Sequence, residues 1–224
     1  MKTQIIVPTA GSGTRLKSKT PKPLVLLNGR PLFIYCLETF QSSVKIDSII
    51  LVVHPRLVDP FKRLVAKFKI SKVKRIVAGG KTRCQSVQNG LKALDADTKI
   101  VAIHDGARPL ISKDIVERAI KLCEKQKAVV VAVAVKPTIK KVDRKTGNII
   151  ETLNRSELWE IQTPQVFDKD LLLKAHQKNK DLNATDDSVL VEKLGVKVKV
   201  IEGDYKNIKV TTAEDLVIAK AFLK

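Results

Sequence analysis

Two glycines and two basic residues follow the first apolar run of the sequence. The stretch PTAGSGTRL (residues 8–16) contains Gly11, Gly13 and Arg15, and Lys22 follows in PKPL. Glycine lets a backbone turn tightly and bring its N–H groups against an anion, where a Cβ would obstruct the approach. The two basic side chains add positive charge, and the flanking prolines fix the backbone that carries Lys22. These residue types predict a site for the phosphate groups of a polyphosphate ligand.

Two other phosphate-binding motifs do not match this stretch. A Walker A loop requires Gly-x-x-x-x-Gly-Lys-Ser/Thr, and that spacing is absent from the sequence. The dinucleotide-binding fingerprint requires a third glycine where this chain has Leu16. For Gly-x-Gly alone, a purely structural turn stays open. Arg15 and Lys22 favour phosphate binding instead.

Apolar runs rich in Val and Ile alternate with amphipathic stretches along the chain. Near-continuous runs of this kind are typical of parallel strands buried on both faces, and the alternation indicates βαβ units in a doubly wound sheet. We predict strands at 4–7, 48–53, 74–77, 99–103, 128–135 and 196–201, and helices at 31–40, 58–68, 85–94 and 112–125, the last capped by Ser112. Ligands bind beyond the carboxyl ends of such strands, where the glycine-rich stretch begins.

One segment breaks this alternation. Residues 137–153, PTIKKVDRKTGNIIETL, predict two short strands around the turn-rich residues 143–148. We expect an arm of approximately 136–157 inserted in a single domain that covers 1–224. Because an isolated hairpin is marginal in water, we expect this arm to pack on a partner subunit, and packing on its own domain stays open.

Length and composition suit one α/β domain. The chain has 224 residues, 44% of them hydrophobic, and three cysteines without a Cys-x-x-Cys pair. We therefore expect buried free thiols rather than disulfides or a zinc site. No segment has the roughly 18 consecutive apolar residues of a membrane helix, and the N-terminal residues lack the features of a secretory signal. We expect a cytoplasmic protein with no membrane partner.

The net charge of +19 suggests a polyanionic ligand. A nucleic-acid-binding protein predicts a basic patch or stripe with aromatic residues that stack on bases. Here the lysines are spread along the whole chain and only 4% of the residues are aromatic. We therefore favour a small anionic substrate and expect no nucleic-acid partner.

Six blocks of the sequence resemble known nucleotidyltransferases. AGSGTRL followed by PKPL is similar to the hexose-phosphate nucleotidylyltransferases. The later blocks are GGKTRCQSVQNGL (79–91), HDGARP (104–109), RSELWEIQTPQVF (155–167), TDD (185–187) and NIKVTTAEDL (207–216). In order and spacing, all six together resemble the 2-C-methyl-D-erythritol 4-phosphate cytidylyltransferase family over essentially the whole chain. The resemblance implies a Rossmann-like α/β fold with a mostly parallel sheet and a projecting β-hairpin that forms a homodimer.

The resemblance also implies a reaction, the transfer of CMP from CTP to 2-C-methyl-D-erythritol 4-phosphate with release of pyrophosphate. Such an in-line displacement requires positioning and neutralisation of charge rather than covalent chemistry from the protein. By motif, Arg15, Lys22 and Lys209 would be the catalytic residues that hold the phosphates, and Mg²⁺ would bridge phosphate oxygens. Among so many anions, Asp105 would bind either the polyol or the Mg²⁺.

Other residues receive binding roles by the same resemblance. The nucleotide-binding set is Pro8, Ala10, Gly11, Gly13, Gly79, Gly80, Arg83 and Ser86, and the set for the polyol phosphate is Asp105, Arg108, Thr138 and Arg155. The last two lie on the arm and would reach the neighbouring subunit's site, since arginine's planar fork suits a phosphate. If the arm folds back, they would serve their own subunit.

Further expectations concern the Asp105–Arg108 pair, His104 and Lys209. A structural pairing of Asp105 with Arg108 stays open. His104 is expected to be structural, because attack by an ionised phosphate requires no general base. Lys209 is expected in a short strand before the last helix, which Thr212 could cap.

Two positions depart from the family pattern. Pro23 follows Lys22 where the family more often has glutamine, and Pro137 precedes Thr138 where an aspartate is usual. The second departure removes a carboxylate that could accept a hydrogen bond from a hydroxyl.

Three alternatives remain at this point. The nearest is ribitol-5-phosphate cytidylyltransferase, which performs the same chemistry on another polyol phosphate. The others are a hexose-phosphate nucleotidylyltransferase using UTP, dTTP or GTP, and a basic nucleic-acid-binding protein without catalysis. The blocks SVQNGL, HDGARP and TIK favour methylerythritol phosphate.

Overall fold

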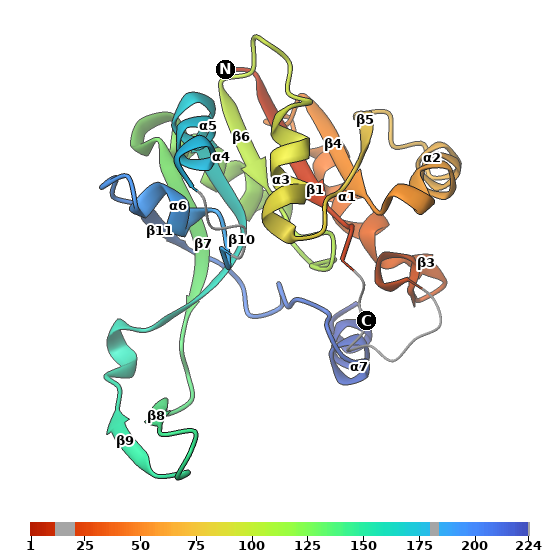
Figure 1. Ribbon diagram of the computed structural model, residues 1–224. Helices are drawn as coiled ribbons and strands as arrows, with labels where there is room; N and C mark the ends of the chain where they lie inside the picture. Colours follow the sequence, from red (N-terminus) through yellow and green to blue (C-terminus); the bar gives the residue numbers. More distant parts are fainter. Residues whose placement is uncertain (12–20, 180–183, 224) are drawn as a thin grey trace.

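A seven-stranded sheet forms the centre of the chain, in a computed structural model that describes residues 1–11, 21–179 and 184–223 (Figure 1). Its strands, in spatial order, are β11 (Lys199–Glu202), β7 (Ala128–Ala134), β10 (Trp159–Asp168), β6 (Ile100–Ile103), β1 (Thr3–Pro8), β4 (Ser48–Val53) and β5 (Val73–Ala78). β6, β1, β4 and β5 are parallel, and so are β11 and β7. The prediction of a mostly parallel sheet, with strands at the six apolar runs, is confirmed.

Strand β10 is the one strand of this sheet that sequence analysis did not predict. It is antiparallel to both β6 and β7. Its sequence, WEIQTPQVFD, mixes apolar and polar residues and includes Pro164, which has no N–H to donate. The pairing with β7 shifts between Ile161 and Gln165, so the proline falls at an irregularity. Buried Gln162, Thr163 and Gln165 therefore replace the apolar run that a buried strand normally shows.

Helices cover both faces of the sheet. On one face lie α1 (Leu32–Ser42), α2 (Val58–Lys67) and α4 (Lys113–Gln126), which pack on alternate residues of β1 and β4 such as Ile5 and Ile49. On the other lie α3 (Arg83–Leu91), α5 (Lys169–Lys178) and α6 (Ser188–Glu192), which pack on Ile6 and Ile50. Because strand side chains alternate between faces, consecutive apolar residues supply both cores.

Several smaller elements complete the description. α7 (Ala213–Phe222) packs beside a short ribbon of β2 (Leu26–Leu27) and β3 (Arg30–Pro31), and single 3-10 turns lie at η2 (Lys22–Leu24), η3 (Pro55–Leu57) and η4 (Arg155–Glu157). The predicted caps are confirmed, since Ser112 accepts a hydrogen bond from Ile115 N and Thr212 from Asp215 N. All three cysteines are buried thiols, as predicted. Among the described residues, no helix is long and apolar enough to cross a membrane.

The predicted hairpin is present and projects from the sheet as a separate arm (Figure 1). Its strands are β8 (Lys140–Val142) and β9 (Ile149–Thr152), and every residue of both is exposed. In the turn, Asp143 Oδ1 accepts hydrogen bonds from the N–H groups of Lys145 and Thr146. The arm does not pack back on its own sheet, which leaves Ile149 and Ile150 each about 60% exposed.

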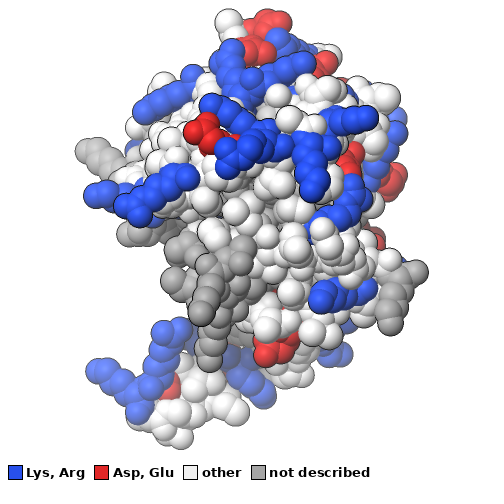
Figure 2. Space-filling model, turned by 90° about the vertical axis from the view of Figure 1, so that its right-hand side faces the viewer, with Lys and Arg blue, Asp and Glu red and all other residues white. Residues whose placement is uncertain are grey.

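Basic side chains are distributed over separate parts of the surface. Figure 2 shows one face on which Lys and Arg occupy the upper part, with Asp and Glu among them, and the lowest part, which is the arm. Among the described residues on this face, basic side chains are thus interspersed with acidic ones rather than gathered in one patch.

Helix α3, which begins at the predicted nucleotide site, packs closely on the sheet. A Cβ on Gly90 would lie 2.6 Å from Ile6 Cγ2 and 3.1 Å from Val52 Cγ2. We expect Gly90→Ala to lower the free energy of unfolding by about 1 kcal/mol in a urea titration. The reason is that overpacking costs about 1–3 kcal/mol, whereas alanine gains roughly 1 kcal/mol in helix propensity.

Gln88→Ala on the same helix is the matched control and should change the free energy of unfolding by no more than about 0.5 kcal/mol. A Gly90→Ala variant more stable than the parent would contradict the close packing of α3 on β1 and β4.

Candidate active site

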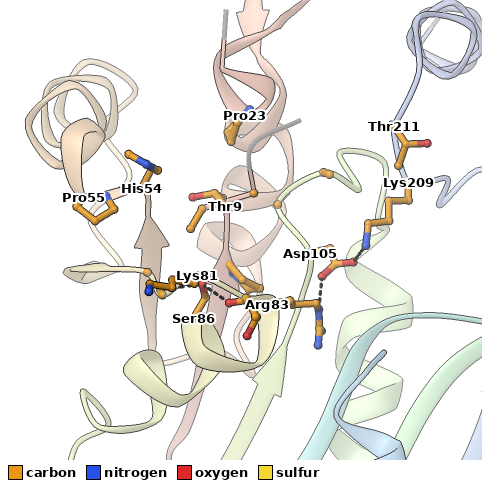
Figure 3. Close-up of a pocket in the computed structure, with 18 residues that line it drawn as sticks. Thr9, Pro23, His54, Pro55, Lys81, Arg83, Ser86, Asp105, Lys209 and Thr211 are labelled. Atoms are coloured by element: carbon orange, nitrogen blue, oxygen red, sulfur yellow. Dashed lines mark hydrogen bonds and ion pairs between the residues drawn. The ribbon is translucent and has the colours of Figure 1, made fainter. Parts of the chain in front are cut away.

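A cavity of about 710 Å³ lies at the carboxyl ends of β1, β4, β5 and β6, beside the first turn of α3 (Figure 3). This volume suits a nucleotide-sized ligand. The structure brings together nine of the predicted residues in its wall: Pro8, Ala10, Gly11, Gly79, Gly80, Arg83, Ser86, Asp105 and Lys209. Parallel strands deliver these residues from distant stretches because their carboxyl ends meet at one edge of the sheet.

The other predicted residues are not part of the described cavity wall. Gly13 and Arg15 fall outside the described residues, and so does the side chain of Lys22, whose backbone begins η2. The described lining does not include Arg108, Thr138 or Arg155. Sequence analysis missed further lining residues, among them Thr9, Pro23, His54, Pro55, Lys81, Thr82 and Thr211.

Glycine is found at positions 11, 79 and 80 for different structural reasons. No described atom lies within 4 Å of a Cβ built on Gly11, so this backbone faces open space at the cavity. A Cβ on Gly79 would overlap Ala10, and one on Gly80 would overlap Gln85. At positions 79 and 80 any larger residue would clash with side chains of this chain, so glycine is required there. Gly11 leaves room for a ligand.

The first turn of α3 is fixed by side-chain hydrogen bonds. The Thr82 hydroxyl accepts from Gln85 N, and the Ser86 hydroxyl accepts from Gly80 N at 3.1 Å and donates to Thr82 O at 3.0 Å. Lys81 N donates to Gln85 Oε1 at 2.8 Å. A rigid helix N-terminus at the cavity wall favours an anionic ligand through the helix dipole. Ser86, predicted to bind the base or ribose, serves this loop in the unliganded chain.

Asp105 lies between two cations at the end of β6. Its Oδ1 is 3.1 Å from Arg83 Nε, and its Oδ2 is 2.5 Å from Lys209 Nζ. Burial alone would raise the pKa of this carboxyl, but the charges of Arg83 and Lys209 outweigh burial and lower the pKa. Asp105 is therefore ionised at neutral pH, and the two cations hold its position.

The alternative pairing of Asp105 with Arg108 does not occur. Arg108 is buried, and its guanidinium donates to the backbone carbonyls of Asn207 at 2.7 Å and Ile161 at 3.4 Å. The expected short strand around Lys209 is also absent. The segment from Asn207 to Thr211 has a single sheet-like contact, the bond from Val210 N to Ala107 O, so side chains rather than a ladder position Lys209.

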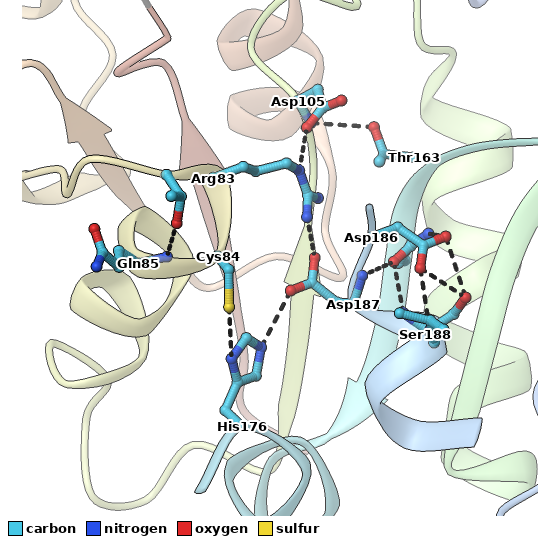
Figure 4. A network of polar contacts seen from close by, with 12 residues as sticks. Arg83, Cys84, Gln85, Asp105, Thr163, His176, Asp186, Asp187 and Ser188 are labelled. Atoms are coloured by element: carbon cyan, nitrogen blue, oxygen red, sulfur yellow. Dashed lines mark hydrogen bonds and ion pairs between the residues drawn. The ribbon is translucent and has the colours of Figure 1, made fainter. Parts of the chain in front are cut away.

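A buried polar network lies behind the cavity wall and was not predicted from the sequence (Figure 4). Arg83 Nη1 is 2.8 Å from Asp187 Oδ2, and His176 Nε2 is 3.1 Å from Asp187 Oδ1. Burial lowers the pKa of the Arg83 guanidinium, but Asp187 and Asp105 outweigh burial and raise it. The TDD block (185–187), which contains Asp187, has no predicted functional role from the sequence. Asp187 is 104 positions from Arg83, and no sequence period pairs them.

His104 is structural, as expected. It is fully buried, with Nε2 3.0 Å from the Arg108 carbonyl and Nδ1 3.1 Å from the Thr163 hydroxyl, which also accepts from Asp105 N. A carbonyl only accepts, so the neutral ring donates from Nε2 and accepts at Nδ1. Burial lowers the pKa of His104 to about 4. The ring therefore supports the backbone of Asp105 from behind.

The arm residues lie away from the cavity of their own chain. Arg155 donates to the carbonyl of Lys136 at 2.9 Å, and the Lys136 ammonium lies 3.5 Å from the centre of the Tyr205 ring. Thr138 is exposed. These contacts fix the base of the arm and leave both predicted substrate ligands outside the described cavity wall.

The buried His104 predicts a loss of stability in mild acid. Because its folded pKa is below its ordinary value of 6.5, protons bind the unfolded chain more readily. The stabilisation is complete above about pH 6.5 and is lost as the pH falls toward about 4. Between about pH 7 and pH 5, urea titrations should show that wild type loses about 2 kcal/mol more stability than His104→Gln. Parallel pH profiles for the two proteins would contradict a buried neutral ring.

Comparisons with known proteins place the chain in a family. A sequence model described as 2-C-methyl-D-erythritol 4-phosphate cytidylyltransferase matches residues 3–224. Proteins of that name from Caldanaerobacter subterraneus subsp. tengcongensis and Alkaliphilus oremlandii are 45% and 44% identical to this chain, covering all of it and 100% and 95% of their own lengths.

A solved structure gives the same result. The crystal structure of 4-diphosphocytidyl-2C-methyl-D-erythritol synthase from Anaerococcus prevotii aligns with a TM-score of 0.85 at 36% identity, covering 99% of this chain and 98% of that one. The family model spans nearly the whole chain, and so do these alignments. This chain therefore belongs to the 2-C-methyl-D-erythritol 4-phosphate cytidylyltransferase family.

Proposed function

We propose that this chain transfers CMP from CTP to 2-C-methyl-D-erythritol 4-phosphate, giving 4-diphosphocytidyl-2-C-methyl-D-erythritol and pyrophosphate in isoprenoid precursor biosynthesis. One observation carries the proposal. The glycine-lined cavity with Asp105 and Lys209 in its wall brings together nine of the residues predicted from this family's blocks. The relatives described above are named for methylerythritol phosphate, which disfavours ribitol 5-phosphate as acceptor.

The chemistry of the cavity wall supports a proposed position for the nucleotide. The open backbone at Gly11, the N-terminus of α3 and the Lys209 ammonium form the cationic side, which suits the triphosphate. The backbone of Gly79 and Gly80 beside Ser86 forms the uncharged side, which suits the cytosine and ribose. Arg15 and Lys22 follow the same loop and would add two charges at the α-phosphate.

Nucleotidyltransferases of this kind depend on a divalent cation, and we propose Mg²⁺. Asp105 is the one carboxylate among the described lining residues, and no described group of three acidic, His or Cys residues could hold a metal alone. Mg²⁺ commonly uses one or two carboxylates with substrate phosphates and waters, so this donor set fits. When bound, the cation would neutralise phosphate charge, with Asp105 as its protein ligand.

The chain's own residues would position and neutralise the reacting phosphates. An acceptor phosphate oxygen attacks the α-phosphorus, the bond to the bridging oxygen breaks, and pyrophosphate leaves with that electron pair. The attacking oxygen is already ionised, so no general base is required. Lys209, with Arg15 and Lys22, would stabilise the negative charge that develops on the transferred group and on pyrophosphate.

The arm would complete the site of a second subunit. Thr138 and Arg155 lie outside their own cavity, and the exposed Val142, Ile149 and Ile150 give the arm an apolar surface without cover in one chain. A symmetric dimer would bury this surface and bring the Arg155 guanidinium to the acceptor phosphate of its partner.

Pyrophosphate release tests the proposed reaction directly. We expect release with Mg²⁺ only when CTP and 2-C-methyl-D-erythritol 4-phosphate are both present, in a matrix that also contains UTP, dTTP, GTP, ribitol 5-phosphate and hexose 1-phosphates. Equal or faster turnover of ribitol 5-phosphate would contradict the assigned acceptor. Tight, salt-sensitive binding of nucleic acid without pyrophosphate release would support the non-catalytic alternative.

Mixed dimers test whether the arm acts across the subunit interface. Arg15→Ala and Arg155→Ala should each lower kcat/KM, Arg15→Ala by roughly a hundredfold. After subunit exchange at equal amounts, half of the dimers contain one subunit of each kind. One of the two sites in such a dimer has both arginines, so about a quarter of the wild-type activity should return.

Arg15→Ala mixed with Lys22→Ala is the matched control, because both changes affect the same subunit's cavity and no site is repaired. Failure of the Arg15→Ala and Arg155→Ala mixture to recover activity despite demonstrated exchange would show that the arm serves its own subunit.

A further inference from the structure

We propose that Asp187 is a positioning residue for nucleotidyl transfer, which holds the Arg83 guanidinium so that Arg83 fixes Asp105 in the cavity wall. The inference rests on the proposed function. It assigns Arg83 mainly to the support of Asp105 and not to direct contact with the cytosine or ribose.

Arg83 is held at both ends of its guanidinium. Nε is 3.1 Å from Asp105 Oδ1 and Nη1 is 2.8 Å from Asp187 Oδ2. The two carboxylates thus bind opposite ends of the guanidinium (Figure 4). Guanidinium donors have a fixed geometry, so two contacts define the plane as well as the position of the group. With one carboxylate removed, the group could rotate about the remaining contact.

Asp187 is itself rigid. Its side chain is 2% exposed, and His176 Nε2 lies 3.1 Å from its second oxygen. Gln165 Oε1, on β10, accepts from the backbone N–H groups of Asp187 and Ser188 at 3.0 and 3.1 Å. The carboxylate is therefore fixed to the central sheet and has no room to follow a moving arginine.

The placement of Arg83 explains why a second carboxylate is required there. The guanidinium borders a cavity that we assign to a triphosphate, and a free arginine there would be drawn to the phosphates. That movement would release Asp105 from one of its two cations. The buried charge of Asp187 opposes it, so Asp105 keeps its position when anions enter the cavity.

The central experiment compares Asp187→Asn with wild type in pyrophosphate release. The amide keeps the shape of the side chain and removes its charge. We expect kcat to fall about tenfold or more, because small displacements of positioning groups are costly, while KM for CTP stays unchanged or falls as Arg83 is freed toward the phosphates.

Asp186→Asn is the matched control. Asp186 bonds to Gln165, Ser188 and Val189 N in the same turn, whereas the ion pairs of Arg83 among the described residues are with Asp105 and Asp187. We expect its kcat to stay within about twofold of wild type at a temperature where circular dichroism shows both variants folded. An equal loss in both variants would overturn the proposal in favour of a general effect of the turn.

A double-mutant comparison separates positioning from stability. If Asp187 acts through Arg83, then Asp187→Asn should cause no further loss of kcat/KM in an Arg83→Gln background, whereas independent effects would multiply. Multiplying losses would overturn the proposal. Absence of pyrophosphate release from wild type would instead count against the proposed function.

Crystal structures of unliganded wild type and Asp187→Asn test the inference without reference to activity. We expect Arg83 Nε to leave hydrogen-bond distance of Asp105 Oδ1 in the variant. An unchanged contact between Arg83 and Asp105 would overturn the positioning role, whatever the assay shows.

Discussion

The carboxylate of Asp105, ionised and held between Arg83 and Lys209, is the interaction on which the site depends. It joins three segments that meet only in the folded chain: the end of β6, the start of α3 and the loop before α7. A lone buried carboxylate would be protonated or displaced, whereas two cations keep it charged and fixed. Phosphate chemistry requires such fixed charges, since reorganisation during the reaction would consume the stabilisation that they provide.

The sheet supplies this arrangement through two kinds of strand. Parallel strands β1, β4, β5 and β6 deliver the glycine loops and Asp105 to one edge. The antiparallel β10 runs beside β6 and carries buried polar side chains where an apolar strand would carry core residues. Thr163 bonds the backbone of Asp105 and the ring of His104, and Gln165 holds the backbone at Asp187. A strand that looks irregular in sequence is thus the support of the site.

Much of this architecture could be predicted from the sequence because local patterns encode it. Six apolar runs, the caps Ser112 and Thr212, and the hairpin at 137–153 each have a short-range signal. Strand β10 was not predicted because several of its buried residues are polar. The ion pair of Arg83 with Asp187 was not predicted because it joins residues far apart in the sequence. Lys209 is not in the expected strand because side-chain contacts, and not a ladder of backbone hydrogen bonds, hold its segment. The family resemblance named nine residues that the structure brings together in the cavity wall, but it could not show which of them contact one another.

A crystal structure of the chain with CTP and Mg²⁺ tests the central assignment most directly. We expect the triphosphate against the Gly11 backbone, the start of α3 and Lys209. The cytosine should lie beside Gly79 and Gly80, with Asp105 still bound to Arg83. A nucleotide bound at another surface, with this cavity empty, would contradict this assignment.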